Sequence, residues 1–274
     1  MQKALRLYYR SNMELLITIF VCLLAGCGAG LGTGFAGMSA AVVITPVLTT
    51  FLGIPAYSAI GIALASDVLA SGISAYTYHK NKNIDIKNGL VMMVMVLLFT
   101  LAGSFIASLV PNEAMGGTSV FMTTIMGIKF IVKPVNTTKD KMNETSPKKR
   151  LVQSLISGAV IGFICGFVGA GGGMMMLMVL TMILGYELKT AVGTSVFIMT
   201  FTALTGAASH FIIDGDMPDV TVLALCIGFT LIFARIGAVI ANKVSTKTLN
   251  RATGVILLLL GIAVIVTKIA TKNI

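Results

Sequence analysis

Charged side chains are scarce in this sequence, and their scarcity excludes an ordinary soluble domain. Asp, Glu, Lys and Arg make up 11% of the 274 residues, whereas 56% are hydrophobic and the mean hydropathy is +0.95. A soluble globular domain carries about a quarter of charged residues. Because one core of ordinary size cannot bury this apolar excess, its natural solvent is lipid. We therefore expect an integral membrane protein.

Signatures of catalysis, of metal binding and of nucleotide binding are also missing. The sequence contains no GxSxG, HExxH or Walker motif. Its four cysteines lie inside apolar segments and form no CxxC or Cys/His pattern. Although the formal net charge is +10, no arginine-rich stripe with interleaved aromatic residues indicates a nucleic-acid partner. We expect no enzyme, no metal and no cofactor, and we place the basic residues against anionic membrane lipid.

What the chain does contain is a series of long apolar segments. Most are 20–24 residues long, and about 20 residues of helix cross a hydrocarbon core of ~30 Å. Helix is required because lipid offers no hydrogen-bonding partner to backbone N–H and C=O groups. We predict an all-α polytopic membrane protein in the plasma membrane of a prokaryote. Its apolar segments cover residues 14–52, 57–78, 88–110, 114–134, 151–184, 190–213, 219–242 and 252–271.

Two of these segments, 14–52 and 151–184, are too long for a single crossing. As a straight helix, each would measure about 50 Å or more. Both are rich in glycine, which is a poor residue for a helix interior and a good one for a backbone turn. We predict that each is two shorter helices joined at the glycines. These are Gly26, Gly28, Gly30, Gly32, Gly34 and Gly37 in the first segment, and Gly162, Gly166, Gly169, Gly171, Gly172 and Gly173 in the second.

The chain also repeats itself at an offset of 132 residues. The register begins at Gly30 and Gly162 and continues to Gly61 and Gly193, with turn-forming glycines in the same order in both copies. This order indicates a duplicated half. We predict a first transmembrane repeat over 1–134, a polar cytoplasmic linker over 135–150 and a second transmembrane repeat over 151–274.

The distribution of basic residues predicts how the halves are oriented. Loop 79–87, linker 135–150 and loop 243–251 are rich in Lys and Arg, and the positive-inside rule places all three in the cytoplasm. The linker and the last loop can share one side only if segment 151–184 folds back on itself as a hairpin, and the repeat implies the same for 14–52. Each half then has five elements. An odd number makes the halves inverted, so we predict an inverted 5+5 arrangement with a glycine-broken hairpin opening each half.

The paired glycine clusters are the strongest candidate for a binding site. They are Gly34-Phe-Ala-Gly37 and Gly166-Phe-Val-Gly-Ala-Gly-Gly-Gly173. Glycine lets the backbone approach a ligand and turn its N–H groups toward it. The helix that follows begins with a positive dipole end, which favours an anion. The alternative is that the glycines only permit close helix packing.

The same residues resemble the sulfite exporter TauE/SafE family. In the first half the pattern is Gly34-Phe-Ala-Gly37 with Pro46, followed by Leu52-Gly53-Ile54-Pro55. The second half shows its own glycine cluster, then Leu184-Gly185 and Ala191-Val-Gly-Thr-Ser195. Met38-Ser39-Ala40 replaces the family's usual glycine run, and Met178 stands where the family often has proline. The resemblance covers about residues 15–268 and implies transport of small, often sulfur-containing anions: sulfite, sulfate, thiosulfate or organosulfonates.

We expect this anion to bind at the two glycine breaks and at the hydroxyl groups that follow them. The candidate residues are Gly34, Gly37, Met38, Ser39, Gly169, Gly171, Gly172, Gly173, Thr194 and Ser195. Asp67 lies near the middle of segment 57–78, and an intramembrane carboxylate is a functional hypothesis by default. It is a candidate for proton coupling, or for pairing with Arg235. The alternatives are an acid that only holds helices together and an arginine that snorkels to the interface.

Taken together, the sequence predicts a secondary membrane transporter that binds its anion near the bilayer midplane, between the two glycine breaks. Its expected partners are the anion, membrane lipid, and protons or another coupling ion. An anion channel and the membrane subunit of a larger complex are the alternatives. The sequence leaves open which anion is carried, the direction of transport, the coupling ion, the oligomeric state and the orientation of the termini.

Overall fold

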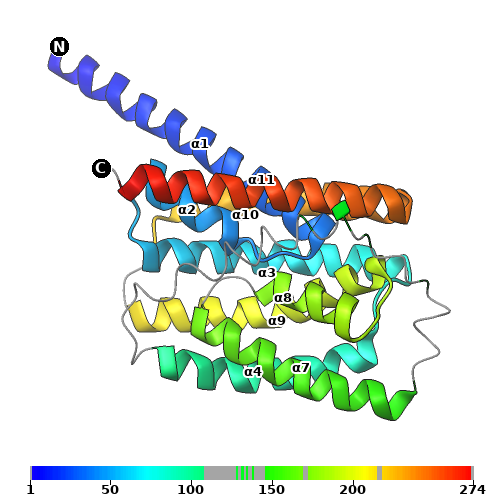
Figure 1. The fold of residues 1–274 in the computed structure, drawn as a ribbon. Coiled ribbons are helices and arrows are strands. Elements are labelled where there is room, and N and C mark those ends of the chain that lie inside the picture. Colours follow the sequence, from blue (N-terminus) through cyan, green and yellow to red (C-terminus); the bar gives the residue numbers. More distant parts are fainter. Residues whose placement is uncertain are drawn as a thin grey trace.

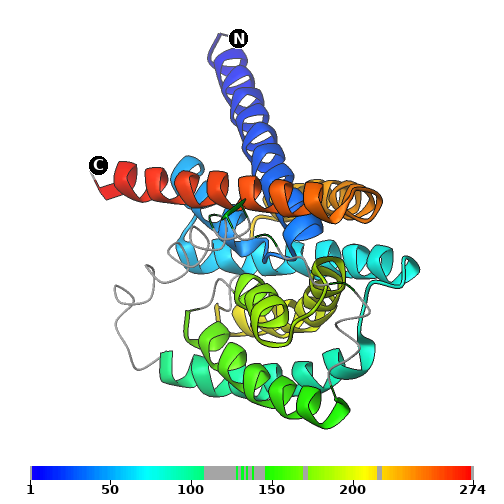
Figure 2. The same cartoon turned by 45° about the vertical axis from the view of Figure 1, so that its right-hand side comes forward.

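Long helices lie side by side in this protein and form three layers (Figures 1 and 2). The computed structural model describes residues 2–107, 146–168, 172–214 and 218–272, and the single positions 128, 131, 132, 134 and 138. Every regular element in these ranges is a helix. Most of predicted segment 114–134, most of linker 135–150, and both Gly169 and Gly171 lie outside the described residues.

The helices follow the predicted apolar segments. The first half contributes α1 (Gln2–Ala36), α2 (Ala41–Phe51), α3 (Ala56–Lys80) and α4 (Ile86–Ala107). The second contributes α7 (Pro147–Val168), α8 (Gly172–Met178), the π-helix η2 (Val179–Ile183), α9 (Leu188–Asp214), α10 (Val220–Lys243) and α11 (Thr246–Lys272). Four described stretches are long and apolar enough to cross a membrane: Met13–Ala36, Ser58–Lys80, Leu188–Ala208 and Val220–Lys243. For the described residues, the predicted all-α fold with long apolar helices is confirmed.

The same backbone turn follows α2 and η2. Gly53 and Gly185, which are 132 residues apart, have φ values of +63° and +65°, a region that suits glycine because it has no Cβ. In both turns the next N–H reaches back six residues: Ile54 N donates to Leu48 O (3.3 Å) and Tyr186 N to Leu180 O (2.8 Å). These bonds satisfy carbonyls at the helix end.

Helices from different halves pair reciprocally. Helix α1 packs along α10, α7 packs along α4, and α3 and α9 pack together between these pairs. A Cβ on Gly30 of α1 would lie 2.5 Å from the carbonyl oxygen of Thr230 in α10. One on Gly162 of α7 would collide with the carbonyl oxygen of Val96 in α4. The two contacts occupy corresponding positions of the predicted repeat, because Gly30 and Gly162 have the same place in it, as do Val96 and Thr230.

The glycines of predicted segment 14–52 therefore serve two purposes, close packing and a backbone turn, which the sequence could not separate. The helix runs without a break through Gly26, Gly30 and Gly34, where a Cβ would lie 2.5 Å from an atom of α10 in each case. For these three glycines, the alternative of close helix packing is the one observed. The interruption falls only at Gly37.

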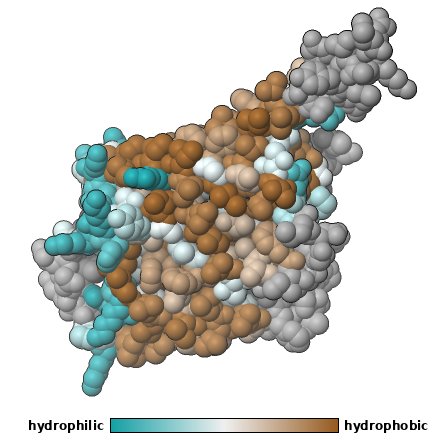
Figure 3. All heavy atoms as spheres, turned by 180° about the vertical axis from the view of Figure 1, so that it is seen from behind, coloured by the Kyte–Doolittle hydropathy of each residue, from teal (hydrophilic) through white to brown (hydrophobic). Residues whose placement is uncertain are grey.

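The basic segments gather at one end of the bundle. Asn83 in the α3–α4 loop donates from Nδ2 to Oδ1 of Asn242 at the end of α10 (2.7 Å), and Arg150 at the start of α7 lies 3.8 Å from Asp85 in that same loop. Figure 3 shows hydrophilic residues at one end of the visible face and a broad hydrophobic band beside them. Side chains such as Leu98 and Ile232 are more than half exposed on the surface. A surface this apolar is suited to lipid.

Candidate functional site

The first helix break is a buried, hydrogen-bonded turn. Helix α1 ends at Ala36, Gly37 follows with a φ of +62°, and α2 begins at Ala41. The Thr33 hydroxyl donates to the carbonyl oxygen of Met38 across the turn (3.0 Å). Met38 and Ser39 are 1% and 4% exposed. The turn is thus a fixed part of the protein interior.

The second glycine-rich segment meets the first at this turn. A Cβ on Gly173 of α8 would lie 2.5 Å from the carbonyl oxygen of Gly37 and 2.9 Å from the backbone nitrogen of Ser39. A Cβ on Gly37 would in turn collide with Oγ of Ser195 in α9. The structure therefore brings together five of the predicted substrate-binding residues, from both halves: Gly37, Met38, Ser39, Gly173 and Ser195. Gly172 begins α8 beside Gly173.

Asp67 of α3 lies against the same turn. It is fully buried, and its Oδ1 accepts a hydrogen bond from the Ser71 hydroxyl (2.9 Å). The Ser39 hydroxyl and the Ala40 N–H also lie beside this carboxylate. Oδ2 nevertheless has no hydrogen-bond partner of good geometry among the described residues. A buried carboxylate with an open oxygen is costly unless it takes up a proton or a ligand.

Three other predicted residues lie apart from this cluster. The Gly34 carbonyl accepts a hydrogen bond from the Tyr78 hydroxyl (2.9 Å), and Gly34 otherwise packs against α10. The Thr194 hydroxyl accepts from the backbone N–H of Asp85 (3.0 Å) and so belongs to the basic end of the bundle. Arg235 is exposed on α10, and the described residues show no ion pair between it and Asp67.

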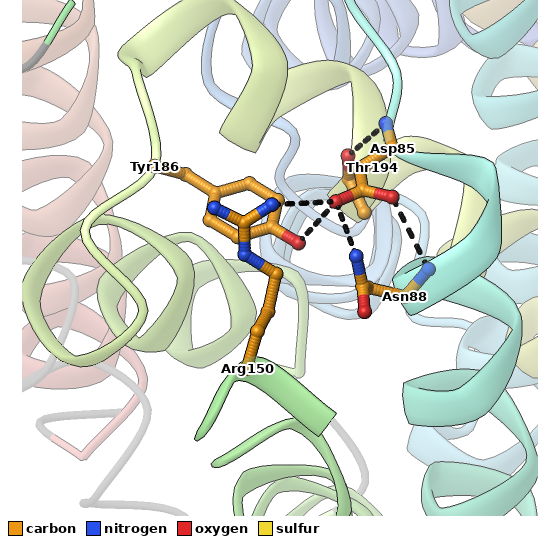
Figure 4. A network of polar contacts seen from close by, with 5 residues as sticks. All are labelled: Asp85, Asn88, Arg150, Tyr186 and Thr194. Carbon is orange, nitrogen blue, oxygen red and sulfur yellow. Dashed lines mark hydrogen bonds and ion pairs between the residues drawn. The ribbon is translucent and has the colours of Figure 1, made fainter. Parts of the chain in front are cut away.

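A polar network at the basic end was missed by sequence reasoning, apart from the inclusion of Thr194 (Figure 4). The Tyr186 hydroxyl donates to Oδ2 of Asp85 (2.7 Å), and so does Nδ2 of Asn88 (2.7 Å). The Arg150 guanidinium lies 3.8 Å from the same oxygen and 5.5 Å from the centroid of the Tyr186 ring. The only signal in the sequence is that Asp85 stands three residues before predicted segment 88–110, in the region where aspartate often caps a helix.

The protonation of Tyr186 suits its role as a donor. Burial, and then the nearby Asp85 carboxylate, raise the pKa of the Tyr186 hydroxyl above its ordinary value. It therefore stays protonated at neutral pH and can donate to Asp85. No group of three His, Cys, Asp or Glu that could hold a metal ion occurs in the described ranges.

Comparisons with known proteins place the chain in a family. The family described as sulfite exporter TauE/SafE matches residues 22–264. The chain is 27% identical over 267 residues to the "Probable membrane transporter protein YunE" of Bacillus subtilis, covering 91% of this chain and 96% of that protein. It is 26% identical over 267 residues to a probable membrane transporter protein of Methanocaldococcus jannaschii, covering 92% and 97% of the two chains. The chain therefore belongs to the sulfite exporter TauE/SafE family of membrane transporters.

Proposed function

We propose that this transporter is a secondary carrier of one small anion, bound where the two glycine-rich breaks meet. The contact of Gly173 with Gly37 and Ser39, beside Ser195, is the observation that carries this proposal. The family's description favours a sulfur-containing anion such as sulfite, sulfate, thiosulfate or an organosulfonate. Relatives from Bacillus, Haemophilus and Methanocaldococcus favour the plasma membrane of a prokaryote as its location.

The chemistry at the breaks suits an anion. Helix α2 begins here without a side-chain cap at Ala40, and the N–H groups of its first turn donate to Ser39 and Ala40. Such a terminus carries a partial positive charge. The Ser39 hydroxyl lies beside Asp67, and the Ser195 hydroxyl, which donates to Val192 O (2.8 Å), would have to turn to donate to an anion. Glycine at 37 and 173 keeps side chains out of the space in which the backbones approach.

The proposal includes an inverted pair of repeats, 1–134 and 151–274, joined by a cytoplasmic linker over 135–150. The reciprocal pairing of α1 with α10 and of α7 with α4 supports this symmetry. The stacking of Arg150 on Tyr186 supports a hairpin over 151–184, because the two ends of that segment lie together. We propose five elements in each half, with a glycine-broken hairpin opening each. The anion would then be reached alternately from either side as the halves rock against each other.

We further propose that Asp67 carries a proton that moves with the anion. A charged carboxylate beside the break would repel a bound anion, whereas a protonated one would not. The open Oδ2 offers a place for that proton. Pairing of Asp67 with Arg235 is not favoured, because Arg235 is exposed while Asp67 is fully buried.

Binding of sulfur anions to the purified protein tests the site. We would record thermal unfolding in detergent with sulfite, sulfate, thiosulfate, sulfoacetate, taurine and chloride, since a ligand of the native state raises its apparent stability. One sulfur anion should shift the unfolding temperature selectively. The shift should disappear in Gly173→Ala, whose Cβ would push the breaks apart, and persist in Gly228→Ala, whose Cβ would have no neighbour within 4 Å.

Two results would contradict the proposal. An unchanged anion shift in a folded Gly173→Ala variant would remove the break from the site. Flux that does not saturate in proteoliposomes would favour an anion channel over a carrier.

A further inference from the structure

The Asp85 network joins the two halves at one end of the bundle. Asp85 lies in the loop between α3 and α4, Arg150 lies in the first turn of α7, and Tyr186 lies between η2 and α9. The Arg150 and Asp85 side chains are only 11% and 14% exposed, so water weakens their attraction less than at an open surface. Three segments from the two halves therefore converge on one carboxylate (Figure 4).

The network is connected to the proposed anion site through α9. Thr194, which accepts from the Asp85 N–H, is the neighbour of Ser195, whose hydroxyl faces Gly37. Successive side chains on a helix point about 100° apart. Thr194 therefore faces the Asp85 network, while the next residue, Ser195, faces the break at Gly37. A displacement that separates Asp85 from α9 would also shift the wall of the site.

Among the described residues, no matching network occurs at the opposite end of the bundle. Asp219 is the counterpart of Asp85 in the repeat and caps α10 in the same way, with Oδ1 accepting from Thr221 N (2.7 Å). Its side chain is exposed, however, and forms no ion pair among the described residues. The positions that match Arg150, Tyr186 and Thr194 in the repeat are Thr18, Ile54 and Ile62.

We propose that the contacts of Asp85 with Arg150, Tyr186 and Thr194 form a latch that holds the basic end of the transporter closed. The latch must open before the site becomes accessible from that side. The inference rests on the alternating access proposed above. Water can replace each hydrogen bond when the latch opens, so the free-energy cost of opening is modest and the latch can close again.

A labelling experiment tests the latch without any substrate. Ser195→Cys places a thiol at the site, and its reaction with a membrane-impermeant maleimide is followed from each side in right-side-out and inside-out vesicles. Peptide mass spectrometry separates this thiol from the native cysteines. Into this background we would introduce Asp85→Asn, Tyr186→Phe, and the matched control Asp219→Asn.

The control Asp219→Asn makes the same substitution at a helix cap that lies outside the latch. Asparagine caps a helix about as well as aspartate, so both aspartate variants keep their caps, but only Asp85→Asn loses the ion pair with Arg150. We expect Asp85→Asn to raise the labelling rate from the basic end about tenfold, because the neutral amide neither attracts Arg150, 3.8 Å away, nor gives the Tyr186 hydroxyl a charged acceptor. Tyr186→Phe should raise the rate in the same direction while it keeps the ring under Arg150. Asp219→Asn should leave the rate from either side unchanged.

The outcomes separate the latch from the anion site. An unchanged labelling rate in Asp85→Asn and Tyr186→Phe would overturn the latch, as would an equal rise in Asp219→Asn. Gel filtration in detergent identifies a variant that fails to fold, and the result then depends on the milder Tyr186→Phe. Because no anion is present, a failure to find an anion by thermal shift leaves the labelling result intact.

Discussion

Replacing Gly30 with alanine tests how tightly the two halves are packed together. The added Cβ would lie 2.5 Å from Thr230 O and 2.7 Å from Ala234 N. Both atoms belong to the α10 backbone, so relief requires the helices to separate. Overpacking of this kind costs about 1–3 kcal/mol, while alanine in place of glycine stabilises a helix by about 1 kcal/mol.

Gly228→Ala isolates the packing cost. Gly228 lies in α10, and a Cβ there would have no neighbour within 4 Å, so this variant gains only the intrinsic helix stabilisation. The difference between the two variants is therefore about 1–3 kcal/mol. For a chain of this size it corresponds to roughly 2–10 °C in unfolding temperature, measured by thermal unfolding in detergent.

Gly162→Ala gives the second half of this test. Its Cβ would collide with Val96 O in α4, the contact that matches Gly30 with Thr230 O in the repeat. The two variants should lose similar amounts of stability relative to Gly228→Ala. The reasoning is refuted if Gly30→Ala unfolds no earlier than Gly228→Ala, or if Gly162→Ala is harmless while Gly30→Ala is not.

Further predictions concern single contacts. Asp67→Asn should abolish the pH dependence of anion uptake in proteoliposomes, and an unchanged pH profile would reject proton transfer by this residue. Tyr78→Phe should lower the free energy of unfolding by about 1 kcal/mol, because it removes the donor to the Gly34 carbonyl; an unaltered denaturation midpoint would contradict this. Gly53→Ala and Gly185→Ala should each cost roughly 1–2 kcal/mol from positive φ alone, since neither Cβ would have a neighbour within 4 Å; unequal losses of stability would contradict their equivalence.

The helical membrane fold could be predicted because it depends on composition and segment length alone. An apolar stretch such as 219–242 must be helical in lipid whatever its neighbours are. A glycine run, by contrast, can adopt either a turn or a helix at similar energy. Gly37 turns the chain, whereas Gly30 stays helical because α10 fills the space beside it. That partner begins far along the sequence, so no local pattern could distinguish the two glycines.

Only part of the candidate site could be predicted, because here too the deciding contacts come from distant parts of the chain. Ser195 and Thr194 are neighbours with similar chemistry, but one faces Gly37 and the other accepts from Asp85. Only the rotation of α9 against the rest of the bundle decides which hydroxyl is where. The network around Asp85 was missed because Tyr186 lies about a hundred residues away in the chain, and the sequence carries no record of that pairing.

The reciprocal pairing of helices also has a consequence for synthesis of the chain. Helix α7 finds its partner α4 already made, but α1 must wait for α10, which begins about 180 residues after α1 ends. At ~5–20 residues per second, that delay is roughly 10–40 s. During this time the glycine face of α1 is covered only by lipid or by another membrane protein. The newly made first half is thus the stage at which a membrane chaperone or a second nascent chain has access to that face.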